Sequence, residues 1–184
     1  MITDRRRLVA GAAGALAAPV FPLDASATPP RATEAVRRER MLAAAERKGV
    51  LLSFFASWCA WCRPMDTLLQ DAAMMRVIGS RYRILHVRAL ERSDTRRAEQ
   101  MPGAEDLMLE FAHPSAGLPF LAFLAPDGRA LATSFSAINH ENIGFPVGEE
   151  NLDAFDAMIA RAAPGVSGSD RAAIRAACTR IARP

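Results

Sequence analysis

The chain has 184 residues, of which 51% are hydrophobic and 23% are charged, and its formal net charge is +3. This length suits a single domain with some additional segments. The composition excludes a disordered or fibrous protein. The arginines are spread along the chain among Asp and Glu without a basic stripe, so the charge pattern also argues against a nucleic-acid partner.

The first residues have the layout of a bacterial export signal. Arg5–Arg7 precede a soft apolar run, Leu8–Leu23, and a small-x-small cleavage pattern follows at Ala25–Ala27. The paired arginines resemble a twin-arginine signal, and the alternatives are an ordinary Sec signal or an uncleaved anchor. We therefore expect residues 1–27 to be an export signal and the mature, non-membrane-spanning chain to begin near Thr28 in the periplasm.

The mature chain alternates between helical and extended patterns. After a linker at 28–33, apolar spacing predicts helices at about 34–48, 59–78, 104–111, 151–163 and 169–182. Apolar runs predict strands at 50–56 and 82–89, and two more within 117–135 that are joined at Asp127-Gly128. Residues 91–102 and 136–150 are predicted loops. The order predicts an α/β fold, with a central mixed sheet flanked by helices on both faces.

Two cysteines, Cys59 and Cys62, stand where the first predicted strand leads into a helix. At this spacing the two sulfurs can form a short disulfide ring. The positive end of a helix favours thiolate over thiol, and Cys59 is expected to gain most of this effect. We therefore expect Cys59 to attack a partner disulfide and Cys62, the less exposed of the pair, to resolve the mixed disulfide.

Two other interpretations of the pair remain open. A metal site needs further ligands, and Cys178 and the three histidines at 86, 113 and 140 show no paired spacing. A purely structural disulfide is the second alternative, although so small a ring constrains the unfolded chain little.

The segment "VLLSFFASWCAWCRPM", residues 50–65, resembles the strand, Trp-Cys-x-x-Cys and helix of the thioredoxin superfamily. The segment "GLPFLAFLAPDGRAL", residues 117–131, is similar to the later part of that family, where an apolar residue and a proline precede a hairpin. The resemblance implies a thioredoxin-like domain over 34–163, followed by a helical extension over 164–184. It also implies that Pro119 forms a cis peptide bond facing the dithiol and that Leu118 touches the cysteine pair.

Around the pair, the expected support residues are Trp58, which would shield the rim of the site, and the intervening Ala60 and Trp61. One departure from the family pattern is Ser53, which stands where thioredoxin has a buried Asp. A serine is a poor proton acceptor at neutral pH, so proton transfer must differ from that of thioredoxin. His86 in the next strand is a candidate for tuning the cysteines or moving protons.

These features predict an exported thiol–disulfide oxidoreductase of the periplasmic thioredoxin-like type. Its partners would be cysteine pairs of other exported proteins, together with a membrane electron donor if the protein acts as a reductase, the direction that we favour. The reaction needs the two sulfurs and no metal or organic cofactor. The alternative is a binding module or metal chaperone that uses the same cysteines as ligands. Cys178 lies on the apolar face of the last helix, where we expect it to pack as a small hydrophobic residue.

Overall fold

The computed structural model describes residues 29–113, 115–136 and 141–183. The predicted export signal at 1–27 lies outside these described residues. Within them, no helix combines the length and the apolar character needed to cross a membrane.

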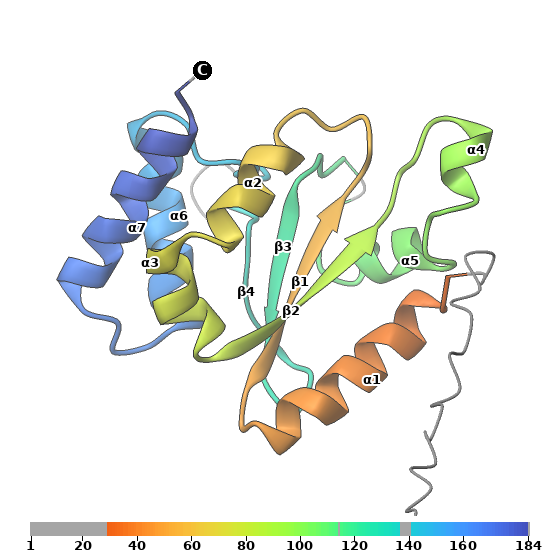
Figure 1. Cartoon of the computed structure of the whole chain (residues 1–184), viewed down its shortest axis with the longest axis horizontal. Helices are drawn as coiled ribbons and strands as arrows, with labels where there is room; N and C mark the ends of the chain where they lie inside the picture. Colours follow the sequence, from red (N-terminus) through yellow and green to blue (C-terminus); the bar gives the residue numbers. More distant parts are fainter. Residues whose placement is uncertain (1–28, 114, 137–140, 184) are drawn as a thin grey trace, which may run out of the picture.

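A four-stranded sheet forms the centre of the domain (Figure 1). Its strands are β1 (Gly49–Phe55), β2 (Tyr82–Arg88), β3 (Phe120–Leu124) and β4 (Ala130–Thr133). The spatial order is β2-β1-β3-β4, with β1 parallel to β2 and antiparallel to β3, and with β4 antiparallel to β3. The parallel pair requires a crossover connection, which the helices between β1 and β2 provide, whereas the hairpin needs none.

The helical segments are α1 (Ala32–Ala45), α2 (Cys62–Leu69), α3 (Ala72–Met74), the π-helical turn η1 (Met75–Gly79), α4 (Asp94–Arg97), α5 (Ala104–Leu109), α6 (Glu149–Ala162) and α7 (Gly168–Ile181). Figure 1 shows α1 and α5 on one side of the sheet and α2, α3, α6 and α7 on the other. The mixed sheet with helices on both faces confirms the predicted α/β fold class, a central mixed sheet flanked by helices.

Alternation along β1 explains why both faces of the sheet are covered. Val50, Leu52 and Phe54 belong to the core on the α1–α5 side, whereas Leu51 belongs to the core on the opposite side. Successive side chains of a strand point to opposite faces, so a strand that is apolar at nearly every position must be buried on both. Ser53 interrupts this pattern, although it is just as buried as its neighbours.

The helix predicted over 59–78 is divided into α2, α3 and η1. The Asp71 carboxylate accepts a hydrogen bond from the Ala73 backbone N–H at 2.9 Å and so caps a new helix after α2. A short side chain that bonds to the nearby backbone competes with helix continuation, and periodicity alone does not register this competition. The predicted loop at 91–102 likewise contains α4, which is capped by Ser93.

Gly49 lies between the predicted helix at 34–48 and the predicted strand at 50–56, and in the structure it is the first residue of β1. The chain turns earlier, at Arg47, whose φ is 57°. A Cβ atom at Gly49 would lie 2.3 Å from the Leu124 carbonyl oxygen and 2.7 Å from the Tyr82 ring. Close approach between strands therefore requires a glycine at this position.

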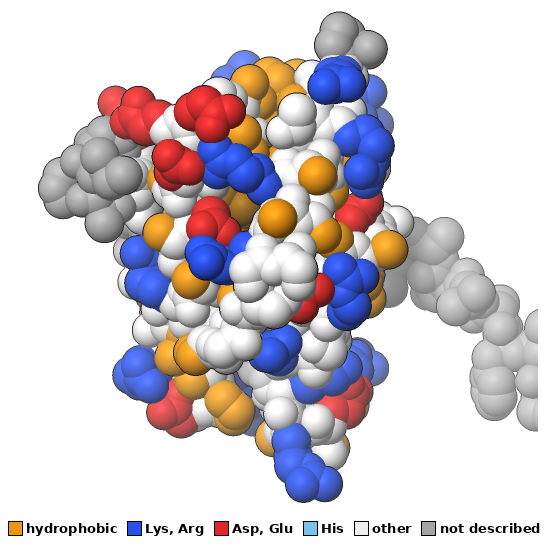
Figure 2. All heavy atoms as spheres, turned by 90° about the vertical axis from the view of Figure 1, so that its left-hand side faces the viewer, with side chains coloured by type: hydrophobic (Ala, Val, Ile, Leu, Met, Phe, Trp, Pro, Cys, Tyr) orange, Lys and Arg blue, Asp and Glu red, His pale blue; other side chains and the backbone are white. Residues whose placement is uncertain are grey.

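The C-terminal helix α7 is joined to the core rather than set apart from it. Ile174, Ala177 and Cys178 are buried in the same cluster as the apolar residues of α2 and α6. Ion pairs with α6 flank this contact, among them Arg171 with Asp156 at 2.5 Å. Figure 2, which views the left-hand side of Figure 1, shows basic and acidic side chains interspersed on this face.

Candidate active site

Cys59 and Cys62 form a disulfide, and their Cα atoms are 5.4 Å apart. The prediction that Cys59 lies within the first helical turn is wrong, because α2 begins at Cys62 and Cys59 lies in the preceding turn. The prediction that Cys62 is the less exposed of the two cysteines is also wrong, because Cys59 is 5% exposed and Cys62 is 7% exposed. The turn folds Cys59 against Ala56, while the intervening Ala60 points into solvent.

The loop before β3 meets the cysteine pair from the other side. Leu118 packs against the small buried cluster formed by Ala56 and the two cysteines. The Leu118–Pro119 peptide bond is cis, the geometry that the family resemblance implies. Because β3 pairs directly with β1, the start of β3 is held next to the end of β1 and therefore next to the turn that carries Cys59. The sheet thus brings together two segments that are about sixty residues apart in the chain.

An open cavity of about 550 Å³ lies beside the disulfide. Its lining comes from the end of β1, the dithiol turn, α2, β2 and the proline loop, and comprises Ser53, Phe55, Ala56, Ser57, Cys59, Cys62, Arg63, Asp66, Thr67, His86 and Pro119. Both sulfur-bearing residues and the cis proline therefore face one space that a partner can enter.

The polar groups of this cavity differ from those of thioredoxin. Ser53, the residue that departs from the thioredoxin pattern in the sequence, is 4% exposed. It is paired in register with His86 on β2, whose Nε2 lies 3.7 Å from the Asp66 carboxylate on α2. The His86 and Asp66 side chains are 44% and 51% exposed, so this ionisable pair of the cavity lining is solvated.

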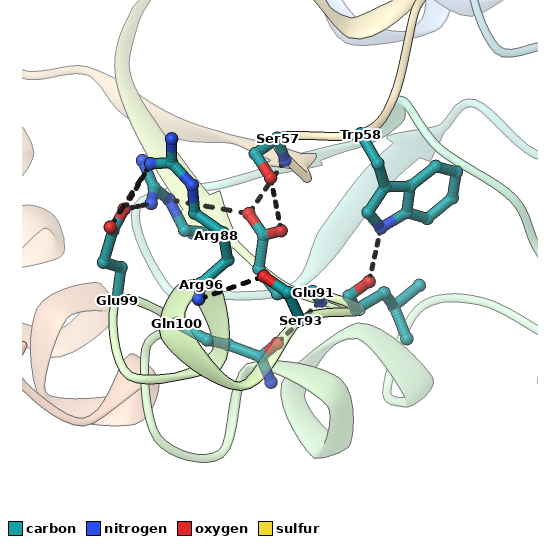
Figure 3. A network of polar contacts seen from close by, with 9 residues as sticks. Ser57, Trp58, Arg88, Glu91, Ser93, Arg96, Glu99 and Gln100 are labelled. Carbon is teal, nitrogen blue, oxygen red and sulfur yellow. Dashed lines mark hydrogen bonds and ion pairs between the residues drawn. The ribbon is translucent and has the colours of Figure 1, made fainter.

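Trp58 directly precedes Cys59 in the chain but is not among the residues that line the cavity, and 40% of its surface is exposed. Its indole N–H donates a hydrogen bond to the Leu90 carbonyl oxygen at 2.7 Å (Figure 3). The Arg92 guanidinium lies 3.6 Å from the ring centroid, within the range of a cation–π contact. The segment after β2 therefore fixes the orientation of this tryptophan.

Glu91 is a buried carboxylate that the sequence analysis did not single out. It accepts hydrogen bonds from the backbone N–H of Ser57 at 2.8 Å and from the Ser57 hydroxyl at 2.7 Å (Figure 3). Its own backbone N–H donates to the Gln100 side chain at 3.0 Å. The signal that could have revealed it is an acidic residue shortly after the end of a strand that runs parallel to β1, since the ends of parallel neighbours meet at one edge of the sheet.

Trp61, between the two cysteines, is 48% exposed and stacks on the buried ring of Phe145. The ring centroids are 5.7 Å apart and the planes are inclined by 9°. Trp61 therefore covers an apolar residue of a distant loop while it keeps one face open to solvent.

Of the histidines named as possible metal ligands, only His86 and His113 lie within the described residues. His86 lines the cavity, whereas the His113 ring bonds to Ser115 at 2.8 Å, and His140 lies outside the described residues. In the part of the chain that the structure describes, no three of His, Cys, Asp and Glu lie together as a potential metal site.

The chain resembles several solved structures, although no protein-family model and no curated protein matches it. One is a disulphide isomerase from Xylella fastidiosa Temecula1, at 18% identity, with 90% of this chain and 100% of that chain covered and a TM-score of 0.46. Another is a DsbH oxidoreductase, at 20% identity, covering 82% and 94% of the two chains with a TM-score of 0.42. A third is the C-terminal domain of DsbD from Neisseria meningitidis, at 21% identity, covering 55% and 81% with a TM-score of 0.39.

Proposed function

We propose that the protein is a thiol–disulfide oxidoreductase that exchanges disulfides with cysteine pairs of exported proteins. The observation that carries this proposal is that Cys59, Cys62 and Pro119 line one open cavity. A purely structural disulfide has no need of an accessible cavity, whereas exchange requires that a partner sulfur approach one of the two cysteines.

In the reducing direction the reaction begins with the dithiol form of the protein. The Cys59 thiolate attacks one sulfur of the substrate disulfide, so that a new S–S bond forms, the substrate S–S bond breaks and one substrate thiolate leaves. Cys62 then loses its proton to water in the cavity and its thiolate attacks the Cys59 sulfur. This second exchange closes the Cys59–Cys62 disulfide and releases the second substrate thiolate. The substrate gains two electrons and the protein loses two.

A return to the dithiol needs an external donor, and we assign this role to a membrane-bound dithiol carrier. The two thiols of the carrier become a disulfide as the Cys59–Cys62 bond is reduced. The compact thioredoxin-like domain supports the reductase direction over that of an oxidase or isomerase. Reduction potentials of such pairs differ by more than about 100 mV, so equilibration of the Cys59–Cys62 couple with glutathione is the measurement that decides the direction.

Turnover of insulin disulfides in the presence of dithiothreitol tests the exchange reaction. We expect the protein to accelerate insulin reduction and Cys59→Ser to abolish this acceleration, because the attacking sulfur is gone. Cys62→Ser should instead accumulate mixed disulfides through Cys59, which are visible on non-reducing gels. Equal rates for the natural chain and Cys59→Ser would contradict the proposed nucleophile.

We also propose that the protein acts in the periplasm, after export directed by residues 1–27. The arginine pair, the apolar run and the small residues at 25–27 support this location. N-terminal sequencing of the protein recovered from the periplasmic fraction should begin at or near Thr28. An intact Met1 would refute cleavage, and recovery from the cytoplasm alone would refute export.

A further inference from the structure

Glu91 is the one charged residue that is buried among those that the structure describes. Its side chain is 0% exposed. It follows the end of β2 at the edge of the sheet where the parallel strand β1 leads into the dithiol turn (Figure 3). Burial removes the water and salt that screen a charge, so this carboxylate acts on its surroundings more strongly than a surface acid does.

The Glu91 carboxylate is bound to the turn that carries Cys59. Its two oxygens accept hydrogen bonds from the Ser57 N–H and from the Ser57 hydroxyl. Two oxygens that both accept are the bonding pattern of an ionised carboxylate. Ser57 precedes Cys59 by two residues, and the Cys59 N–H donates to the Ala56 carbonyl oxygen at 3.2 Å. The negative charge is therefore bonded to the same short turn as the cysteine that is proposed to attack.

The nearest cation, Arg88, balances only part of this charge. Its Nε lies 3.9 Å from a Glu91 oxygen, beyond the range of a hydrogen bond. The same guanidinium binds the Glu99 carboxylate, which also pairs with Arg96 (Figure 3). Arg97 reaches Glu91 at its backbone carbonyl oxygen, at 3.2 Å. Arg88 is thus shared between two acids, and the buried carboxylate keeps part of its field at the dithiol turn.

The other ionisable groups around the cysteine pair are exposed. They are Arg63 and Asp66 on α2, His86 on β2 and Arg92 after β2. Water and salt screen the effect of such groups on a nearby sulfur. Among the described side chains, Glu91 is therefore the one whose charge acts on Cys59 with the least screening.

We infer that Glu91 restrains the ionisation of Cys59 in the reduced protein, so that the attacking sulfur stays a thiol to higher pH and the dithiol remains a ready donor of electrons. A carboxylate beside a thiolate is a like-charge pair, whereas a thiol or a disulfide carries no charge for it to oppose. A stabilised thiolate favours the reduced protein and makes the couple oxidising. The inference rests on the proposed function and names the residue that biases it towards reduction of substrate disulfides. Glu91 takes no part in the exchange of sulfurs.

Glu91→Gln tests this role because it removes the charge and keeps the bonds. Its carbonyl oxygen can still accept the Ser57 N–H, and its NH₂ group can donate to the Ser57 oxygen. Alkylation of Cys59 by iodoacetamide is measured against pH in a Cys62→Ser background, where the other remaining thiol, Cys178, is fully buried. We expect the midpoint pH to fall by about one half to one unit. The limiting rate at high pH should change less than about threefold.

The same interaction should appear in the redox equilibrium of the chain that has both cysteines. At a pH above both midpoints, equilibration of Glu91→Gln with glutathione should move about three- to tenfold towards the dithiol form. The matched control is Glu46→Gln, which removes an acid that pairs with Arg83 at the opposite end of the sheet, where β2 begins. It should leave the midpoint and the equilibrium unchanged.

A midpoint of Glu91→Gln within about 0.2 unit of that of the parent chain would overturn the inference and leave the proposed function intact. An equal shift in Glu46→Gln would also overturn it, because the effect would then follow the net charge of the chain. If Glu91→Gln does not fold, as judged by thermal unfolding, Glu91→Met removes the charge with a side chain of similar length and the same outcomes apply. Absence of insulin turnover in the natural chain would instead refute the proposed function, and with it this inference.

Discussion

At the scale of single residues, the buried carboxylate of Glu91 is the least expected part of the site. It satisfies the backbone N–H and the hydroxyl of Ser57, two residues before Cys59. Without it, the Ser57 N–H would lose its partner close to the buried cysteine pair. Glu91 thus fixes the path of the chain between the end of β1 and the dithiol turn.

Glu91→Ala should therefore lower the free energy of unfolding by about 1–3 kcal/mol, because a buried hydrogen-bond network loses its acceptor. Glu91→Gln can still accept from the Ser57 N–H and can donate to the Ser57 oxygen, so we expect a loss below about 1 kcal/mol. Urea unfolding of the two variants and the natural chain in the oxidised form checks the difference. Equal losses in both variants would show that the negative charge, rather than the bonding geometry, is what matters.

The contacts of single residues also show which parts of the site could be predicted from the sequence and which could not. The family resemblance pointed to Leu118 and Pro119; Leu118 packs against the cysteine cluster, and Pro119 lines the same cavity as the two cysteines. Asn142, whose side-chain NH₂ group donates to the carbonyl oxygens of Gly117 and Pro119, and Glu91 were not predicted, because their partners are backbone groups far away in the chain. No local spacing records which carbonyl or N–H a side chain will meet after folding.

At the scale of elements, α7 is part of the hydrophobic core against which α2 packs. Ile174 is 3% exposed and lies in the same cluster as Leu68 of α2. Ion pairs between α7 and the segment after α2 add to this contact, including Arg76 with Asp170 at 2.9 Å. Such exposed pairs are each worth little, so apolar burial dominates the docking of the helix.

Ile174→Ala should consequently lower the free energy of unfolding by about 2–5 kcal/mol, because it leaves a cavity between α7 and the core. Ile181→Ala is the matched control, since Ile181 is only partly buried near the end of the same helix and should cost less. Chemical denaturation of both variants makes the comparison. A loss at Ile174 no larger than that at Ile181 would contradict the assignment of α7 to the core.

At the scale of the whole molecule, stability should fall in alkaline solution because of one buried thiol. Burial raises the pKa of Cys178 from 9.0 to about 12. The folded chain therefore retains a proton that the unfolded chain releases above pH 9, so the unfolded state gains relative stability as pH rises. The contribution of this thiol is fully present below about pH 9 and is lost between about pH 9 and 12. Burial likewise raises the pKa of the Tyr82 hydroxyl, which acts in the same direction.

Urea unfolding of the oxidised protein at pH 8 and at pH 10.5 tests this expectation, because the disulfide-bonded cysteines do not titrate. The natural chain should lose stability between the two pH values, and Cys178→Ala should lose less, since Tyr82 alone remains of the two groups. An identical loss in both proteins would show that groups other than Cys178 cause the loss of stability in alkaline solution.

The amino-acid sequence by itself determined the α/β class, the order of most helices and strands along the chain, and the position of the dithiol between a buried strand and a helix. These follow from apolar periodicity and from turn residues, which act over a few neighbours and can be recognised without tertiary contacts. The tertiary structure decided where the helix after the dithiol begins and breaks, how deeply each cysteine is buried, and which side chains hold the site. Those properties depend on partners brought together by the sheet, such as Asn142 at the proline loop and Glu91 at Ser57. Contacts between distant segments form only once β1, β2 and β3 are paired, and for that reason local patterns do not contain them.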